Sequence, residues 1–202
     1  MVRRRIAVLG LALIGGAFAN AHGATDALGA FRDGPHDGRI ARASGFVCPD
    51  RVGPYIRDAA GQSGMSRKRV FCSYYALDGI YGTVRILPLA GKFDGPSLLA
   101  GQFSQEAGSG GRVVAQKSRS FHSASGPLHV FTRTYETSHL ENLHYRVSYA
   151  SAPVLGWVVE VISEYASPRD DATKTVFLNW VYGPGLATLQ PRQAAGASPA
   201  GQ

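Results

Sequence analysis

Alternation of apolar and polar side chains in two late segments most constrains the fold of this 202-residue chain. Residues 143–149 read Leu-His-Tyr-Arg-Val-Ser-Tyr, and residues 157–162 read Trp-Val-Val-Glu-Val-Ile. Successive side chains of a strand point to opposite faces, so each segment predicts a strand with one more apolar face. Residues 112–117 and 127–136 read as further strands. Short links between the runs predict antiparallel neighbours.

A hairpin precedes these strands. Residues 70–75 and 80–87 are rich in β-branched and aromatic side chains, and Asp78-Gly79 lies between them. Asp-Gly tolerates the positive φ angles of tight β-turns. Together with the later runs, the hairpin predicts an antiparallel sheet of about five to six strands.

Two segments have helical spacing instead. Asp94-Gly95-Pro96 supplies a capping residue and an early proline for the first helix, and Gly108 ends it. Its apolar stripe consists of Leu98, Leu99, Phe103 and Ala107.

The second helix has the clearer signals. Ser167 is its predicted N-cap, Pro168 its first residue, Asp170 an acid in its first turn, and Gly183-Pro184 its end. Its apolar positions are Ala172, Val176, Phe177, Trp180 and Val181, with Trp180 expected in the core. The element order predicts one α+β domain over residues 45–189, a sheet backed by helices.

The N-terminal residues resemble an export signal. Arg3, Arg4 and Arg5 precede an apolar run from residue 6 to 18, and Ala19-Asn20-Ala21 is a signal-peptidase pattern. The run is short against the roughly 20 residues that span a bilayer, so a membrane anchor is the weaker reading. We expect a signal peptide over residues 1–21, cleavage before His22, and a periplasmic or secreted protein with no stable membrane span after cleavage.

Composition separates two further segments from the domain. Residues 22–44 are rich in Gly, Ala, Asp and Arg without an apolar period, and are predicted to be a flexible leader. Residues 190–202 are a tail of small residues, predicted to be disordered. Loss of the signal peptide would lower the formal charge from +7 to +4. The remaining basic residues are scattered, which argues against a nucleic-acid partner.

The two cysteines predict a cross-link. In an oxidising compartment, Cys48 and Cys72 are expected to form a disulfide. They lie too far apart for a redox Cys-x-x-Cys motif, so the bond would be structural. Val70 and Tyr74 share a strand face with Cys72, and if that face is the inner one, Cys72 is buried.

The residues around this cross-link carry a resemblance. Residues 46–57 read Phe-Val-Cys-Pro-Asp-Arg-Val-Gly-Pro-Tyr-Ile-Arg, and Tyr74-Tyr75 and residues 78–85, Asp-Gly-Ile-Tyr-Gly-Thr-Val-Arg, follow. This pattern resembles a group of exported bacterial domains that are similar in plan to the Mog1/PsbP-like proteins. The resemblance implies a binding or accessory module. It implies no catalytic residues, since that group shares none.

Motifs for chemistry are missing from the sequence. It has no Gly-x-Ser-x-Gly or His-Glu-x-x-His, and the Gly-Ser-Gly-Gly run at 108–111 lacks a phosphate-loop lysine. His139, Glu141 and His144 are the one compact group of metal-capable side chains, but a strand would direct His144 away from the other two. We therefore expect no catalytic residues, metal or cofactor.

Two polar groups remain as candidate surfaces. The first is formed by outward positions of the late strands, which either pair across the sheet or line a polar ligand surface: Arg133, Arg146, Glu160 and Glu164. The second is a hairpin patch of Tyr75, Tyr81 and Arg85, which either packs at the sheet edge or contacts a partner.

These observations favour a noncatalytic binding or accessory module of the cell envelope, with an envelope protein or glycolipid as partner. An envelope hydrolase with dispersed catalytic residues and a secreted effector or adhesin are the alternatives. A deep pocket with converging carboxylates or histidines would favour the hydrolase. A flat, aromatic-rich exposed surface would favour a protein partner.

Overall fold

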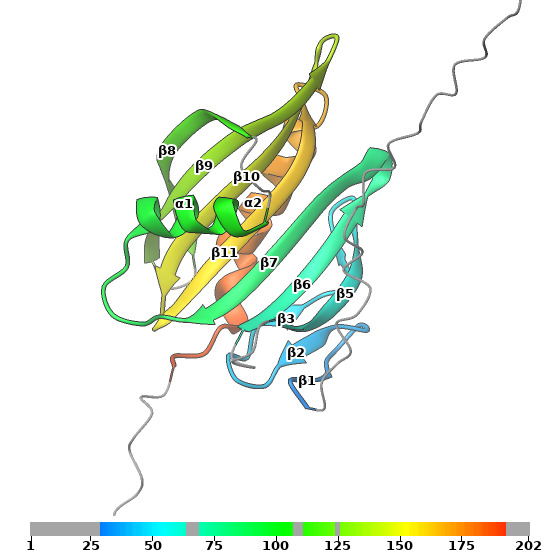
Figure 1. The fold of residues 1–202 in the computed structure, drawn as a ribbon. Helices are drawn as coiled ribbons and strands as arrows, with labels where there is room; N and C mark the ends of the chain where they lie inside the picture. The colour runs from blue at the N-terminus through cyan, green and yellow to red at the C-terminus, as the bar shows by residue number, and fades with distance from the viewer. Residues whose placement is uncertain (1–28, 64–68, 107–110, 124–125, 193–202) are drawn as a thin grey trace, which may run out of the picture.

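An eight-stranded antiparallel sheet carries the fold (Figure 1). The computed structural model describes residues 29–63, 69–106, 111–123 and 126–192. The order across the sheet is β4-β5-β6-β7-β11-β10-β9-β8. Its strands are β4 (Arg51–Val52), β5 (Tyr55–Ser63), β6 (Arg69–Ala76), β7 (Ile80–Pro88), β8 (Arg112–Ser123), β9 (Gly126–Leu140), β10 (Leu143–Val154) and β11 (Trp157–Ser167).

A small three-stranded sheet precedes it. Its strands are β1 (Phe31–Asp33), β2 (Arg39–Ala41) and β3 (Val47–Cys48). The prediction of a flexible leader over 22–44 is therefore wrong for residues 29–44. Phe31, Ala41 and Phe46 are buried, and these few apolar contacts order a segment with no apolar period. The predicted signal peptide lies outside the described residues.

The first residues of the predicted tail are also held in place. The Gln190 amide donates to the Ser44 carbonyl at 2.8 Å. The Arg192 guanidinium donates to the Leu89 carbonyl at 2.7 Å. Residues 193–202 lie outside the described residues.

The predicted hairpin is confirmed as β6 and β7, which pair in register from Val70 opposite Ile86 to Ala76 opposite Ile80. A 3-10 turn, η1 (Leu77–Gly79), joins them, and Gly79 has a φ of +79°. A residue with a Cβ is disfavoured in this left-handed region, which explains the glycine.

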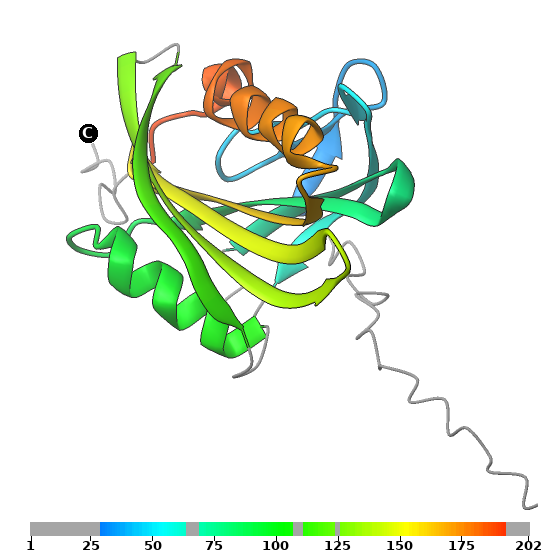
Figure 2. The same ribbon diagram turned by 90° about the horizontal axis from the view of Figure 1, so that it is seen from above.

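Two α-helices are found among the described residues, on opposite faces of the sheet (Figure 2). The first, α1 (Gly95–Glu106), buries Leu99 and Phe103 against β9, β10 and β11. Asp94 caps it as predicted: its carboxylate accepts the Ser97 amide at 3.3 Å and the Ser97 hydroxyl at 2.8 Å. The predicted end, Ala107 and Gly108, lies outside the described residues.

The second helix, α2 (Asp171–Tyr182), begins later than predicted. Its N-cap is Asp170, while Ser167 ends β11 and Pro168 lies in the turn between them. The Asp170 carboxylate accepts hydrogen bonds from the backbone amide of Ala166, four residues earlier, at 2.8 Å and from the Arg169 guanidinium at 2.7 Å. Burial opposes ionisation of Asp170, but these hydrogen bonds outweigh it and lower its pKa.

The larger core lies between α2 and the sheet face that carries Val70, Cys72 and Tyr74, all buried as the strand pattern predicted. Phe177 of α2 packs at ring-centroid distances of 4.7 Å from Tyr55 and 5.4 Å from Tyr74.

The ends of this core differ in part from the sequence prediction. Trp180 is only partly buried and makes an edge contact with Phe46 at 6.3 Å. Val176, expected in the apolar stripe, is 44% exposed. Gly183 ends α2 as predicted.

The architecture is mainly antiparallel β-sheet with two helices, which matches the α+β expectation in outline. The predicted sheet of five to six strands is too small, because β4 and β5 carry no clear alternation. Within the described residues, no helix has the length and apolar character needed to cross a bilayer.

Candidate ligand pocket

A pocket of about 260 Å³ opens between α2 and the β8-β9-β10-β11 half of the sheet. Figure 2 shows this half of the sheet curving around α2. The pocket is lined by Ala115, Lys117, Arg119, Phe121, Val130, Thr132, Thr134, Arg146, Tyr165, Asp171, Lys174, Thr175 and Leu178.

Strand register explains the lining from the sheet. Side chains at i and i+2 share a face, so every second residue from Ala115 to Phe121 of β8 faces the pocket. Lys117 lies opposite Thr132 and Arg119 opposite Val130 on β9. The pocket floor therefore changes along the strands from threonine hydroxyls to a valine.

Helical spacing explains the lining from α2. Asp171, Lys174, Thr175 and Leu178 are related by steps of three, four and seven residues, which place them on one face of a helix. Along this face the helix changes from charged to apolar. Tyr182, one turn past Leu178, packs against Phe121 of β8 with ring centroids 5.3 Å apart. The apolar end of the α2 face therefore lies at the same end of the pocket as Val130 of the floor.

Lys174 is held in one position at the polar end. Its ammonium donates to the Tyr165 hydroxyl at 3.1 Å and lies 4.4 Å from the centroid of the same ring. Tyr165 itself is buried on β11. The cation is therefore fixed at the pocket wall by a hydrogen bond and a cation–π contact.

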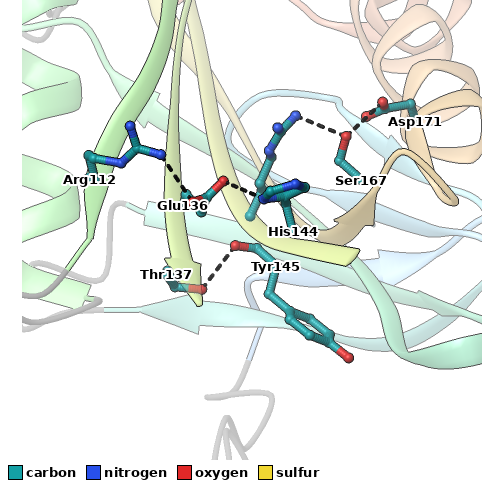
Figure 3. A network of polar contacts seen from close by, with 8 residues as sticks. Arg112, Glu136, Thr137, His144, Tyr145, Ser167 and Asp171 are labelled. Carbon is teal, nitrogen blue, oxygen red and sulfur yellow. Dashed lines mark hydrogen bonds and ion pairs between the residues drawn. The ribbon is translucent and has the colours of Figure 1, made fainter. Parts of the chain in front are cut away.

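Arg146 enters the same end from β10. Its Nη1 donates to the Ser167 hydroxyl at 2.9 Å. The Ser167 hydroxyl in turn donates to the Asp171 carboxylate at 2.9 Å (Figure 3). The Arg146 Nε atom is buried and has no hydrogen-bond partner among the described residues. A buried donor without a partner costs free energy, so Arg146 retains capacity for an acceptor in this region.

The pocket is strongly cationic. Its lining holds four basic side chains and one carboxylate, that of Asp171. Between these cations and the carboxylates of the described residues, no ion pair is formed. The cations are Lys117, Arg119, Arg146 and Lys174. Arg119 instead lies over the Phe121 ring, 5.6 Å from its centroid.

A second polar network lies beside the pocket, at the start of β8, near the end of β9 and near the start of β10 (Figure 3). Glu136 accepts from Arg112 at 3.1 Å and pairs with His144 at 2.9 Å. The hydrogen bond from Arg112 is the main cause of a lowered Glu136 pKa; burial opposes it and the charge of His144 adds to it. These contacts join the three strand ends.

The chemistry of the lining suits an anion better than it suits proton transfer. Lysine and arginine stay protonated near neutral pH, and no histidine lines the pocket. The Ser167 hydroxyl, beside the lining, donates to Asp171 while accepting from Arg146. What the arrangement offers a ligand is fixed positive charge and free N–H donors.

The hairpin patch predicted from sequence is split by the structure. Tyr75 and Tyr81 are directly opposite each other and are 41% and 49% exposed. Arg85 lies on the same face of β7 but is partly buried, opposite Glu160 of β11. The two tyrosines form an exposed pair, and Arg85 beside it is partly buried.

The outward late-strand positions are corrected in two cases. Glu160 is 3% exposed and accepts from Gln102 of α1 at 3.0 Å, because α1 covers that face. Arg146 faces α2 and lines the pocket. Arg133 donates to Gln116 across the sheet at 2.8 Å, and Glu164 is exposed.

The expectation for the histidine group is also corrected. His139 and His144 lie opposite each other on β9 and β10, with ring centroids 6.3 Å apart, so they share a face. Glu141 lies in the turn between these strands with a φ of +52°. Within the described residues, no three metal-capable side chains form a group that could hold an ion.

The predicted disulfide is confirmed. Cys48 and Cys72 are bonded, and both are buried. The bond joins β3 of the small sheet to β6 of the large one.

Sequence reasoning missed most of the pocket. Lys117 and Arg119 look like solvent-facing strand positions, and Lys174 looks like the polar face of a helix. One signal was available: cations at alternate positions 117 and 119 share a face with Phe121, which is unusual for a purely solvated strand face.

Neither the protein-family models nor the curated proteins gave a match to this chain. The pocket is therefore the main source of information about its function.

Proposed function

We propose that this chain is an exported, noncatalytic binding module of the cell envelope that takes a ligand into the pocket between α2 and the sheet. The observation that carries the proposal is the pocket itself. It has about 260 Å³ of space, close to the lower end of the 300 to 1,000 Å³ typical of small-molecule sites.

The chemistry of the lining supports binding over catalysis. A hydrolase needs a side chain that exchanges a proton near the working pH, and the lining is dominated by groups that hold their protons. The one carboxylate, Asp171, already accepts a hydrogen bond from Ser167. These features favour a binding module over the envelope hydrolase.

The location in the envelope rests on two features. The Cys48–Cys72 disulfide is typical of oxidising compartments. The N-terminal pattern ending in Ala19-Asn20-Ala21 is typical of a cleaved signal peptide. Together they support a periplasmic or secreted protein.

A titration of the mature, oxidised protein tests the binding role. Isotope-labelled protein is titrated with small molecules of positive, neutral and negative charge, and the backbone amide resonances are followed. We expect at least one probe to shift amides of β8, β9 and α2 in a saturable way. If no probe of any charge does so, the pocket is not a ligand site.

Mass spectrometry of protein recovered from the periplasm tests the export role. The expected mass begins at His22 and carries a closed disulfide. An intact Met1, or two free thiols in the recovered protein, would contradict the proposed location.

A further inference from the structure

We infer that the ligand is a small amphipathic organic anion, with a carboxylate or phosphate monoester at one end and a short apolar body at the other. This inference rests on the proposed binding role and names the ligand class. Its basis is the polarity change along the pocket, in which β9 and α2 agree.

The polar end carries the donors. Lys174 is fixed over Tyr165 at 4.4 Å, and Arg146 is held through Ser167 at 2.9 Å, so both cations are positioned before a ligand arrives. The buried Arg146 Nε atom has no partner among the described residues. An anionic oxygen at this end would accept charge-assisted hydrogen bonds, which are stronger than neutral ones.

Lys117 and Arg119 extend the positive charge along β8. No carboxylate among the described residues neutralises the four cations through an ion pair, and Asp171 supplies one negative charge. The formal excess inside the lining is three positive charges. A cationic or neutral ligand would leave this excess uncompensated.

The opposite end is more apolar, and the one cation there, Arg119, lies over the Phe121 ring. Phe121, Val130 and Leu178 line it, and Val130 is fully buried. Lys174 and Leu178 are four residues apart on α2, which corresponds to about 6 Å along the helix axis. A body of hexanoate length spans this distance. A bare inorganic anion would leave the apolar end unfilled, which loses the hydrophobic contribution to binding.

Calorimetry and amide titration with matched probes test the ligand class. Hexanoate and hexyl phosphate carry both features; acetate lacks the body, hexanol lacks the charge, and hexylammonium has the opposite charge. We expect either hexyl anion to bind at least tenfold more tightly than acetate, hexanol and hexylammonium. The shifted amides should belong to β8, β9 and α2.

Charge-removing variants tie the preference to the pocket. Lys117 is exposed, so Lys117→Met should keep the thermal stability of the wild type. We expect Lys117→Met and Lys174→Met each to weaken hexanoate binding at least fivefold. Lys92 is exposed and outside the lining, so Lys92→Met is the matched control and should bind like wild type.

The outcomes separate this inference from the binding role itself. If hexanol or hexylammonium binds in the pocket as tightly as hexanoate, the anion preference is wrong and the binding role stands. If Lys92→Met weakens binding as much as the two pocket variants, the effect is net charge and the pocket assignment fails. If no probe binds, both proposals fall.

Discussion

The ammonium of Lys174 on α2 donates to the hydroxyl of Tyr165 on β11 at 3.1 Å and lies 4.4 Å from the centre of the same ring. One residue pair therefore links the start of the helix to the sheet. It also fixes a cation at the wall of the pocket. The same pair therefore contributes to the stability of the fold and, under the proposed binding role, to the ligand pocket.

Tyr165→Phe should separate the two contacts. The variant keeps the ring under Lys174 but removes the hydroxyl, so we expect a loss of about 0.5 to 1.5 kcal/mol in the free energy of unfolding, typical of one hydrogen bond. Urea denaturation at pH 7 measures it. Lys174→Met in the same assay should lose at least as much, and an unchanged Tyr165→Phe protein would show that the hydrogen bond contributes nothing.

The disulfide should stabilise the fold by closing a long loop. Cys48 and Cys72 are 24 residues apart, so replacing both with alanine should lower the free energy of unfolding by about 3 to 4 kcal/mol in the chain-entropy account. Denaturation of the double variant beside the oxidised wild type measures the difference. Equal midpoints for the two proteins would refute the stabilising role.

The sequence predicted the parts of this fold that depend on local pattern. The β6–β7 hairpin followed from Asp78-Gly79, and the long late strands followed from their alternation. Burial of Cys72 followed from the shared face of its strand. Each of these features is decided by residues close together in the chain.

Features that depend on distant contacts could not be predicted in this way. Glu160 looks like an outward strand position, and only the placement of α1 makes it buried. Residues 31–33 and 39–41 pair as antiparallel strands of the small sheet, although their sequence has no apolar alternation that would predict strands. The pocket needs β8, at the edge of the sheet, to lie close to α2, and the topology of the whole sheet sets this arrangement.

Two glycines should respond oppositely to alanine. A Cβ on Gly82 would lie 2.6 Å from the Phe177 ring, which is fully buried, so Gly82→Ala should cost about 1 to 3 kcal/mol through overpacking. Gly101 lies inside α1 with open space around it, so Gly101→Ala should add about 0.5 to 1 kcal/mol. Thermal and urea unfolding give both values. A stable Gly82→Ala protein would contradict the close packing of β7 against α2.

The Glu136 network should make stability depend on acid pH. The hydrogen bond from Arg112 lowers the pKa of Glu136 in the folded state, so its stabilisation is complete above the unfolded value of about 4.3 and disappears as the pH falls through the folded value. Arg112→Met should therefore be less stable than wild type at pH 7, and the difference between the two should shrink as the pH falls below the unfolded pKa. Urea midpoints from pH 7 to 3 measure this.

Arg133→Met is the matched control for that experiment. Arg133 also donates from one strand to the next, but its partner is the neutral amide of Gln116. The effect of this substitution should stay constant over the same pH range. A constant difference for Arg112→Met as well would show that Glu136 does not carry the acid dependence.

The exposed hairpin pair and its partly buried neighbour Arg85 should behave differently when substituted. Tyr75 and Tyr81 are 41% and 49% exposed, so replacing both with serine should change the free energy of unfolding by less than about 1 kcal/mol. Arg85 lies opposite the buried carboxylate of Glu160, so Arg85→Met should cost more, about 1 to 3 kcal/mol. Urea unfolding of the three proteins at pH 7 ranks them. A partner that binds through the tyrosine pair would be lost in the double variant at unchanged stability, whereas a double variant that unfolds like Arg85→Met would place both tyrosines in the packed structure of the sheet.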